Sequence, residues 1–134
     1  MDSARPTRRR EVTVEAVGES LNTNVDYGPY RWSLSGDDAD APDPVSSFLG
    51  ALGSCLLMSL RAAARARNLT VGKSAVTARA NEIGHVKEIE VELQVQTSAD
   101  DNQLRRLVEV AERGCHIRAM IRDEVAFTLT VMRV

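Results

Sequence analysis

The chain has 134 residues, of which 43% are hydrophobic and 27% are charged, a composition typical of one globular domain with one core. A formal net charge of -2 gives no overall basic field for phosphates, and with 4% aromatic residues there are few rings to stack on bases. These figures argue against nucleic acid as a partner. We predict a single domain over residues 1–134, in which one site carries the function.

The amino terminus is predicted to be a flexible basic tail, residues 1–10, because it contains the run "RPTRRR" and no apolar pattern. An apolar core of the kind that secretory signals need does not follow it. The uncharged run at residues 46–60 is shorter than the roughly 20 apolar residues of a membrane span. We therefore expect a cytoplasmic protein without a membrane partner. Two cysteines in that reducing compartment are expected to be thiols, either redox-active or simply buried.

The first third of the chain has the pattern of a small antiparallel meander. Residues 11–17 alternate apolar and polar side chains, as in a half-buried strand. Two more short strands are predicted within residues 17–36, separated by Gly28 and Pro29. A polar, proline-containing loop follows at residues 37–44.

A long helix is predicted from Pro44 to about Arg67, with Asp43 as its cap. Apolar residues cover nearly its whole circumference, so we expect it to be packed on several sides. Gly50 and Gly53 lower helix propensity and indicate close approach of another backbone. Because a chain of this size can hardly surround such a helix, we expect a second subunit, and hence a homodimer, to help bury it.

The second half is predicted to contain a hairpin, a helix with a broken end and a last strand. The hairpin strands cover residues 70–80 and 86–96, with a turn at residues 81–85. A helix start near Ser98 and a left-handed stop at Gly114 bound the helix. The side chains expected to face the core are Ile89, Val91, Leu93 and Val95 in the hairpin, Leu104, Leu107, Val108 and Ala111 in the helix, and Val125, Phe127, Leu129 and Val131 in the last strand. The predicted fold class is α+β, with the order βββ-α-ββ-α-β.

The two cysteines occupy different local environments. Cys115 follows the helix break, at the expected N-terminus of the next turn, where free amides and the helix dipole favour a thiolate. Cys55 lies inside the apolar helix, where burial raises a thiol pKa unless a cation or hydrogen-bond donor is near. The residues alone leave two interpretations open, a reactive pair or buried apolar filler.

The helix "DPVSSFLGALGSC", the hairpin after it and the break "AERGCHI" together resemble the OsmC/Ohr family of thiol-dependent hydroperoxide reductases, from about residue 11 onward. The resemblance implies an OsmC-like fold and an intertwined homodimer, in which sheets shared between subunits wrap two long central helices. For the family's peroxidases it implies that Cys55 is the peroxidatic nucleophile and Cys115 the resolving cysteine. An external dithiol would then reduce the disulfide, with no cofactor or metal. The substrate implied is a small organic hydroperoxide, or another apolar ligand, in a dry pocket.

This sequence departs from the family's peroxidases at two places, the start of the long helix and the residue after the second cysteine. They carry a glutamate one or two positions after the helix-initiating proline, where Val45 and Ser46 stand here. That glutamate orients an arginine, for which Arg31 is the candidate, although a surface arginine is an equal interpretation. Ser46 serves either the first helical turn or the vacated carboxylate position. His116 stands where the family has a proline after the second cysteine. Two interpretations are open: the histidine is a proton donor or acceptor near Cys115, or it simply faces solvent.

Two other functions therefore remain open. One is a dimeric small-molecule binding or redox-sensing protein that kept the fold and thiols but lost efficient peroxidase activity. The other is a metal site formed by Cys55, Cys115, His85 and His116. No CxxC or HxxxH spacing, which is typical of metal ligands, supports it. Whether the chain is an enzyme depends on which of these holds.

Overall fold

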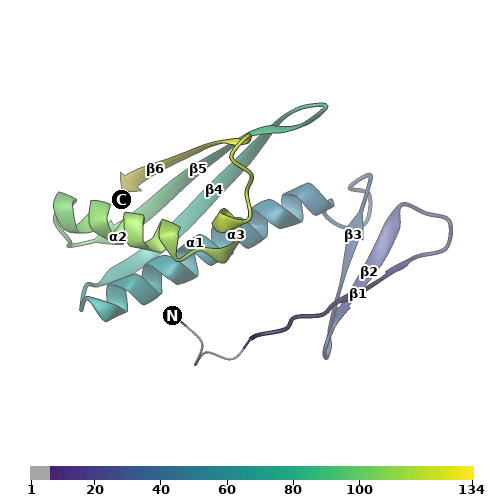
Figure 1. Ribbon diagram of the computed structural model, residues 1–134, viewed down its shortest axis with the longest axis horizontal. Coiled ribbons are helices and arrows are strands. Elements are labelled where there is room, and N and C mark those ends of the chain that lie inside the picture. Colours follow the sequence, from purple (N-terminus) through teal and green to yellow (C-terminus); the bar gives the residue numbers. More distant parts are fainter. Residues whose placement is uncertain (1–6) are drawn as a thin grey trace. The chain divides into compact units, whose positions relative to one another are not determined.

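The structure is a computed structural model that describes residues 7–134 and divides the chain into two compact units, Met1–Ser47 and Phe48–Val134 (Figure 1). Its elements are β1 (Thr13–Ala16), β2 (Asn22–Tyr27), β3 (Tyr30–Ser35), α1 (Pro44–Ala66), β4 (Val71–Ile83), β5 (His85–Thr97), α2 (Asp101–Arg113), α3 (His116–Ala119) and β6 (Ala126–Arg133). The predicted α+β class and element order are confirmed, and the predicted broken end is the short helix α3. The prediction of one domain over the whole chain stays a prediction. The predicted basic tail lies in part outside the described residues, and residues 7–10 form no helix or strand.

The first unit is an antiparallel sheet in the order β1-β2-β3, as the meander pattern predicts. Gly28, with φ +54°, and Pro29 form the two-residue turn between β2 and β3. One face of the sheet carries the row Val14, Val25 and Trp32. The prediction that β1 is half-buried is wrong, since all four of its residues are exposed.

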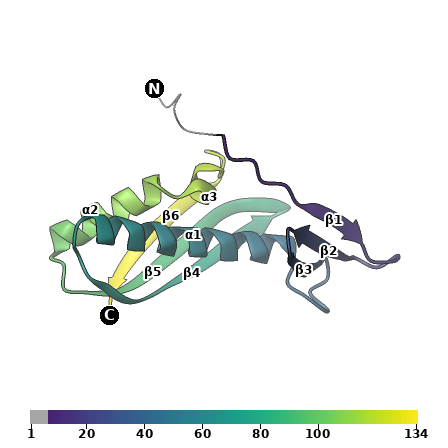
Figure 2. The same ribbon diagram turned by 90° about the horizontal axis from the view of Figure 1, so that it is seen from below.

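The second unit is a sheet in the order β4-β5-β6, with α1 and α2 on one of its faces (Figure 2). β4 and β5 form the predicted antiparallel hairpin, and β6 pairs with β5 in parallel. The hairpin turn is tighter than the predicted segment 81–85. The strands run through Ile83 and resume at His85, because Gly84, with φ +75°, makes the reversal alone.

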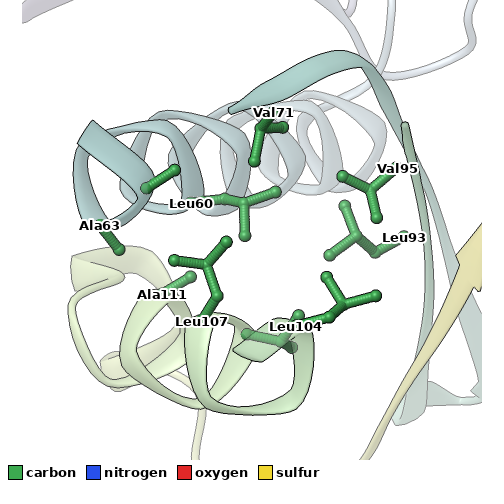
Figure 3. Packing of buried hydrophobic residues seen from close by; sticks show 10 residues of the cluster. Leu60, Ala63, Val71, Leu93, Val95, Leu104, Leu107 and Ala111 are labelled. Carbon is green, nitrogen blue, oxygen red and sulfur yellow. The ribbon is translucent and has the colours of Figure 1, made fainter. Parts of the chain in front are cut away.

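The core of this unit contains most of the side chains predicted to face inward. All four of the β5 residues and all four of the α2 residues named above are buried. Figure 3 shows how Leu60 from α1, Leu107 from α2 and Val95 from β5 point into one interior. In β6, by contrast, Val131 is 40% exposed, so the predicted inward face ends before this position.

The long helix α1 begins as predicted, with the Asp43 carboxylate accepting from the Ser46 amide at 2.8 Å. It ends at Ala66, one residue before the predicted end. At Gly53 the close neighbour is a side chain rather than the expected backbone, since an added Cβ would lie 3.3 Å from a Val76 methyl carbon. At Gly50 an added Cβ would meet no other part of the described chain within 4 Å, so a close approach there stays a prediction.

By length and composition alone, α1 could cross a membrane, as buried core helices also could. The sequence argument against a span counted only the uncharged run of residues 46–60, whereas the helix has 23 residues. Its six buried residues, Leu52, Gly53, Leu56, Leu60, Ala63 and Ala64, pack within the second unit or line its core. The absence of a membrane partner stays a prediction.

Candidate thiol site

The second unit brings Cys55 and Cys115 together, although they are 60 positions apart in sequence (115 - 55). Cys55 lies in the fourth turn of α1, and Cys115 lies between α2 and α3. Cys115 belongs to a hydrophobic cluster with buried Leu52, Leu56 and Ile89, and the partly buried Cys55 packs against this cluster. The helix–hairpin–helix order therefore achieves the proximity that a dithiol reaction requires.

The end of α2 places Cys115 against α1. α2 begins with a capping box at Asp100 and Gln103, two residues after the start predicted at Ser98. It ends at Gly114 as predicted, but the left-handed conformation predicted there is wrong, since φ is -82°. A different constraint explains this glycine: an added Cβ would lie 2.8 Å from the Ser59 hydroxyl of α1. Gly114 thus permits a close helix–helix approach one residue before the cysteine.

Cys115 is the N-cap of α3, which confirms its predicted place at the start of a new turn. Its sulfur accepts a hydrogen bond from the Arg118 amide at 3.4 Å. The side chain is only 1% exposed, whereas Cys55 is partly exposed. Of the two thiols, Cys55 is therefore the one that a solute can reach.

The two thiols differ in the direction of their pKa shifts. Burial acts to raise the pKa of Cys55, but the Ile117 amide, the Cys115 thiol and the His116 amide stabilise its thiolate and leave the pKa below the ordinary value. Burial raises the pKa of Cys115 above its ordinary value; the Arg118 amide opposes this rise, and the neighbouring Cys55 sulfur adds to it. The α3 amides of Arg118 and Ile117 act to lower the pKa of Cys115, as expected, but burial and the neighbouring Cys55 sulfur outweigh them, so the expected net preference for a thiolate on Cys115 is wrong.

Arg118 fixes α3 to its surroundings, a role that the sequence did not indicate. Its guanidinium donates to Glu112 at 3.3 Å and lies 3.9 Å from the ring centre of Phe127. Glu112 and Arg118 are six residues apart and lie on either side of a helix break. Ion pairs within a continuous helix are three or four residues apart, so that spacing rule could not predict this pair. These contacts hold the turn whose amides face Cys55.

Arg31 lies in the first unit, on the polar face of its sheet, where it forms a two-point ion pair with Asp26. Its Nε and Nη2 atoms donate to the two carboxylate oxygens at 2.7 and 3.0 Å. The Arg31 hydrogen bond lowers the pKa of Asp26, and the Asp26 hydrogen bond raises that of Arg31. The pairing was open to sequence reasoning, because counting outward from the Gly28-Pro29 turn places the two residues directly opposite each other. A role for Arg31 beside the thiolate stays a prediction.

The two accessory candidates act differently from each other. The Ser46 hydroxyl donates to Asp43 at 3.0 Å, so it serves the first turn of α1. The His116 side chain is exposed, and it is the backbone amide of this residue that acts on Cys55. Within residues 7–134, no three His, Cys, Asp or Glu side chains gather as a metal site would require.

A groove of about 420 Å³ lies between α2 and β6, and neither cysteine lines it. Its apolar residues are Leu104, Val108, Leu129 and Val131, and its rim is charged. Because it is removed from the thiols, this groove does not provide the dry substrate pocket that the resemblance implies.

Comparisons with known proteins agree on the fold. An uncharacterized protein of Haloferax volcanii is 24% identical over 123 residues, covering 90% of this chain and 92% of the relative. The crystal structure of an OsmC-like protein from Mycoplasma pneumoniae superposes with a TM-score of 0.86 at 13% identity, covering 95% of this chain and 98% of the other. An organic hydroperoxide resistance protein from Elizabethkingia anophelis, with thiocyanate bound, superposes with a TM-score of 0.69 at 20% identity, covering 96% and 100%.

The comparison with family sequences is the decisive one. The model of the family described as OsmC-like protein matches residues 36–130, well over half of the chain and including both cysteines. This match confirms the resemblance found in the helix and break motifs: the chain belongs to the OsmC-like family.

Proposed function

We propose that this protein reduces organic hydroperoxides through its two cysteines, with Cys55 as the peroxidatic and Cys115 as the resolving residue. The observation that carries the proposal is the pair itself. A partly exposed thiol with a lowered pKa lies against a buried thiol with a raised pKa, in one cluster. That asymmetry suits a nucleophile and its resolving partner.

The proposed chemistry proceeds in two steps through sulfur. The Cys55 thiolate attacks the terminal oxygen of the peroxide, the O–O bond breaks, and the alkoxide leaves with a proton as an alcohol. Cys55 is then a sulfenic acid. The Cys115 thiol gives up its proton and attacks that sulfur, which forms the disulfide and releases water. An external dithiol, the proposed reducing partner, returns both residues to thiols by exchange.

The named relatives support the substrate class. The Elizabethkingia anophelis structure described above is an organic hydroperoxide resistance protein, and it shares this fold at 20% identity. The apolar surroundings of the pair favour an alkyl peroxide over hydrogen peroxide, because burial of an alkyl group is favourable. We further propose that the protein works as a homodimer in the reducing cytoplasm.

One alternative has a specific observation in its favour. The two positions that carry the activating glutamate in the family's peroxidases hold Val45 and Ser46. Arg31, the candidate thiolate partner, is bound to Asp26 instead. A dimeric ligand-binding or redox-sensing protein with slow peroxide chemistry is the second candidate function. It predicts thermal stabilisation by an apolar ligand, with little peroxide consumption.

The test is to react the reduced protein with one equivalent of cumene hydroperoxide and to follow thiol loss and disulfide formation by mass spectrometry. The wild type should form a Cys55–Cys115 disulfide and one equivalent of alcohol. Cys55→Ser should consume no peroxide. Cys115→Ser should stop at a sulfenic acid that dimedone captures.

Survival of both thiols in the wild type would refute the peroxidase proposal and favour the ligand-binding alternative. Equal peroxide consumption by Cys55→Ser would refute the assigned roles of the cysteines.

A further inference from the structure

Ser59 repeats the placement of Cys55 one turn further along α1. Residues four apart lie on one face of a helix, so Cys55 and Ser59 face the same neighbour. Across from them, Ala111 and Cys115 are also four residues apart. The Ser59 hydroxyl donates to the Ala111 carbonyl at 2.7 Å, and the Cys55 and Cys115 side chains lie within hydrogen-bonding reach of each other. The two helices are therefore joined at two consecutive turns, first by a hydrogen bond and then by the thiol pair.

The break at the end of α2 creates the need for this bond. In a continuous helix the Cys115 amide would donate to the Ala111 carbonyl. Here that amide donates to Glu112 at 3.2 Å instead. Ser59 supplies a donor from the neighbouring helix to the carbonyl that the break releases, and a part-buried carbonyl without a donor is unfavourable.

Gly114 makes the same contact sensitive to a single methyl group. An added Cβ at this position would lie 2.8 Å from the Ser59 hydroxyl oxygen, and its next neighbour would be the Val110 carbonyl at 3.4 Å. The serine hydroxyl is the sole atom closer than ordinary contact, and it is held by its own hydrogen bond. Side-chain size at position 114 is therefore coupled to the hydroxyl at position 59.

We propose that Ser59 is a positioning residue for the cysteine pair. Its hydrogen bond to the Ala111 carbonyl, which the missing side chain of Gly114 leaves room for, holds Cys115 within reach of Cys55. The inference deepens the proposed function and rests on it for its use in turnover. Ser59 itself transfers no electron or proton. The step it assists is attack of Cys115 on oxidised Cys55 sulfur, which forms the disulfide and expels water from a sulfenic acid or reduced glutathione from a mixed disulfide.

The experiment measures the equilibrium of the disulfide against oxidised and reduced glutathione, without any peroxide. In this exchange one glutathione disulfide accepts two electrons and two protons from the two cysteines and yields two reduced glutathiones. Ser59→Ala should lower the equilibrium constant about five-fold, the size expected for one lost hydrogen bond. Ser59→Thr, which keeps the hydroxyl, should restore most of it.

Gly114→Ala should also lower the constant, by about ten-fold, because the new methyl group displaces Cys115 from α1. In the Ser59→Ala background the same Gly114→Ala change should have little further effect, since the opposing hydroxyl is absent. The control is Thr97→Val, which removes another hydroxyl-to-carbonyl bond of 2.7 Å, to Thr70, together with the hydrogen bond that this hydroxyl accepts from the Ala99 amide at 3.1 Å. It should reduce the free energy of unfolding and leave the thiol equilibrium unchanged.

The outcomes separate this inference from the proposed function. Equal equilibrium constants for the wild type and Ser59→Ala would overturn the inference even if the protein reduces peroxides. A lowered constant in Ser59→Ala, rescued by threonine, supports the inference even if the wild type consumes no peroxide. Additive effects of the Ser59 and Gly114 changes would overturn the coupling between them, and a wild type that forms no disulfide at any glutathione ratio would overturn both proposals.

Discussion

At the residue scale, the thiol site works by dividing two roles between like side chains. Cys55 and Cys115 share one cluster, yet the α3 amides stabilise the thiolate of Cys55, while burial and the neighbouring sulfur keep Cys115 protonated. From the residues alone, the thiolate was expected on Cys115, and Cys55 was expected to need a hydrogen-bond donor, which the α3 amides supply; the family resemblance already implied Cys55 as the nucleophile. The direction of an amide depends on the three-dimensional path of α3, which no residue pattern encodes.

This asymmetry predicts the pH dependence of alkylation. The thiolate is the form that reacts with iodoacetamide, and its fraction rises as the pH passes the pKa. Because the pKa of Cys55 is lowered and that of Cys115 is raised, the half-maximal rate of Cys55 should occur at a lower pH than in the unfolded chain, and that of Cys115 at a higher pH. Peptide mass spectrometry of the reduced protein after timed alkylation measures both rates.

Two controls sharpen that measurement. In urea both cysteines should react alike, because the folded environment is lost. Cys115→Ala removes a hydrogen-bond donor to the Cys55 thiolate, so the Cys55 midpoint should move to higher pH. Faster alkylation of Cys115 than of Cys55 in the folded protein would contradict the assigned roles.

At the element scale, apolar periodicity predicted the second unit well. The four alternating β5 residues and the i, i+3, i+4 face of α2 are buried as expected, because each pattern matches one face of a regular element. Predictions at the element ends were poorer. At the N-terminal end of α2, the cap is Asp100 and not the predicted Ser98. At the C-terminal end, Gly114 is required by its close contact with Ser59 of another helix and not by a left-handed conformation. Such contacts between distant segments have no signature in local sequence.

The burial of α1 within its own chain gives a stability prediction. Leu52 is 0% exposed and packs in the cluster that holds the cysteines. Leu52→Ala should lower the free energy of unfolding by about 2–5 kcal/mol, since it leaves a cavity in a packed core. Urea denaturation of the reduced protein measures the loss. Ile83→Ala at the 79% exposed hairpin end is the control and should cost less than about 0.5 kcal/mol. Equal losses for the two variants would contradict the core position of Leu52.

At the scale of the whole molecule, the chain leaves apolar surface uncovered in both units. In the first, Trp32 and Val14 remain exposed on the sheet face that carries the apolar row. In the second, α1 buries one side, while Phe48 and Met58 on other sides are exposed. The sequence argument for a partner rested on apolar residues all round this helix. One side of that circumference is covered by the chain itself, and the remainder is the surface that we propose a second copy covers.

Met58 offers the sharpest test of that proposal, because it is 71% exposed in the middle of α1. If a second copy packs on this side of the helix, Met58→Lys places a charge in an apolar interface, which costs several kcal/mol unless the charge is paired. Analytical ultracentrifugation should then show a wild-type dimer and a largely monomeric variant at the same micromolar concentration. Ile83→Lys is the matched control, since it adds the same charge at an equally exposed residue away from α1, and it should remain dimeric. A wild-type monomer, or dissociation by Ile83→Lys alone, would show that the exposed side of α1 is not the interface between copies.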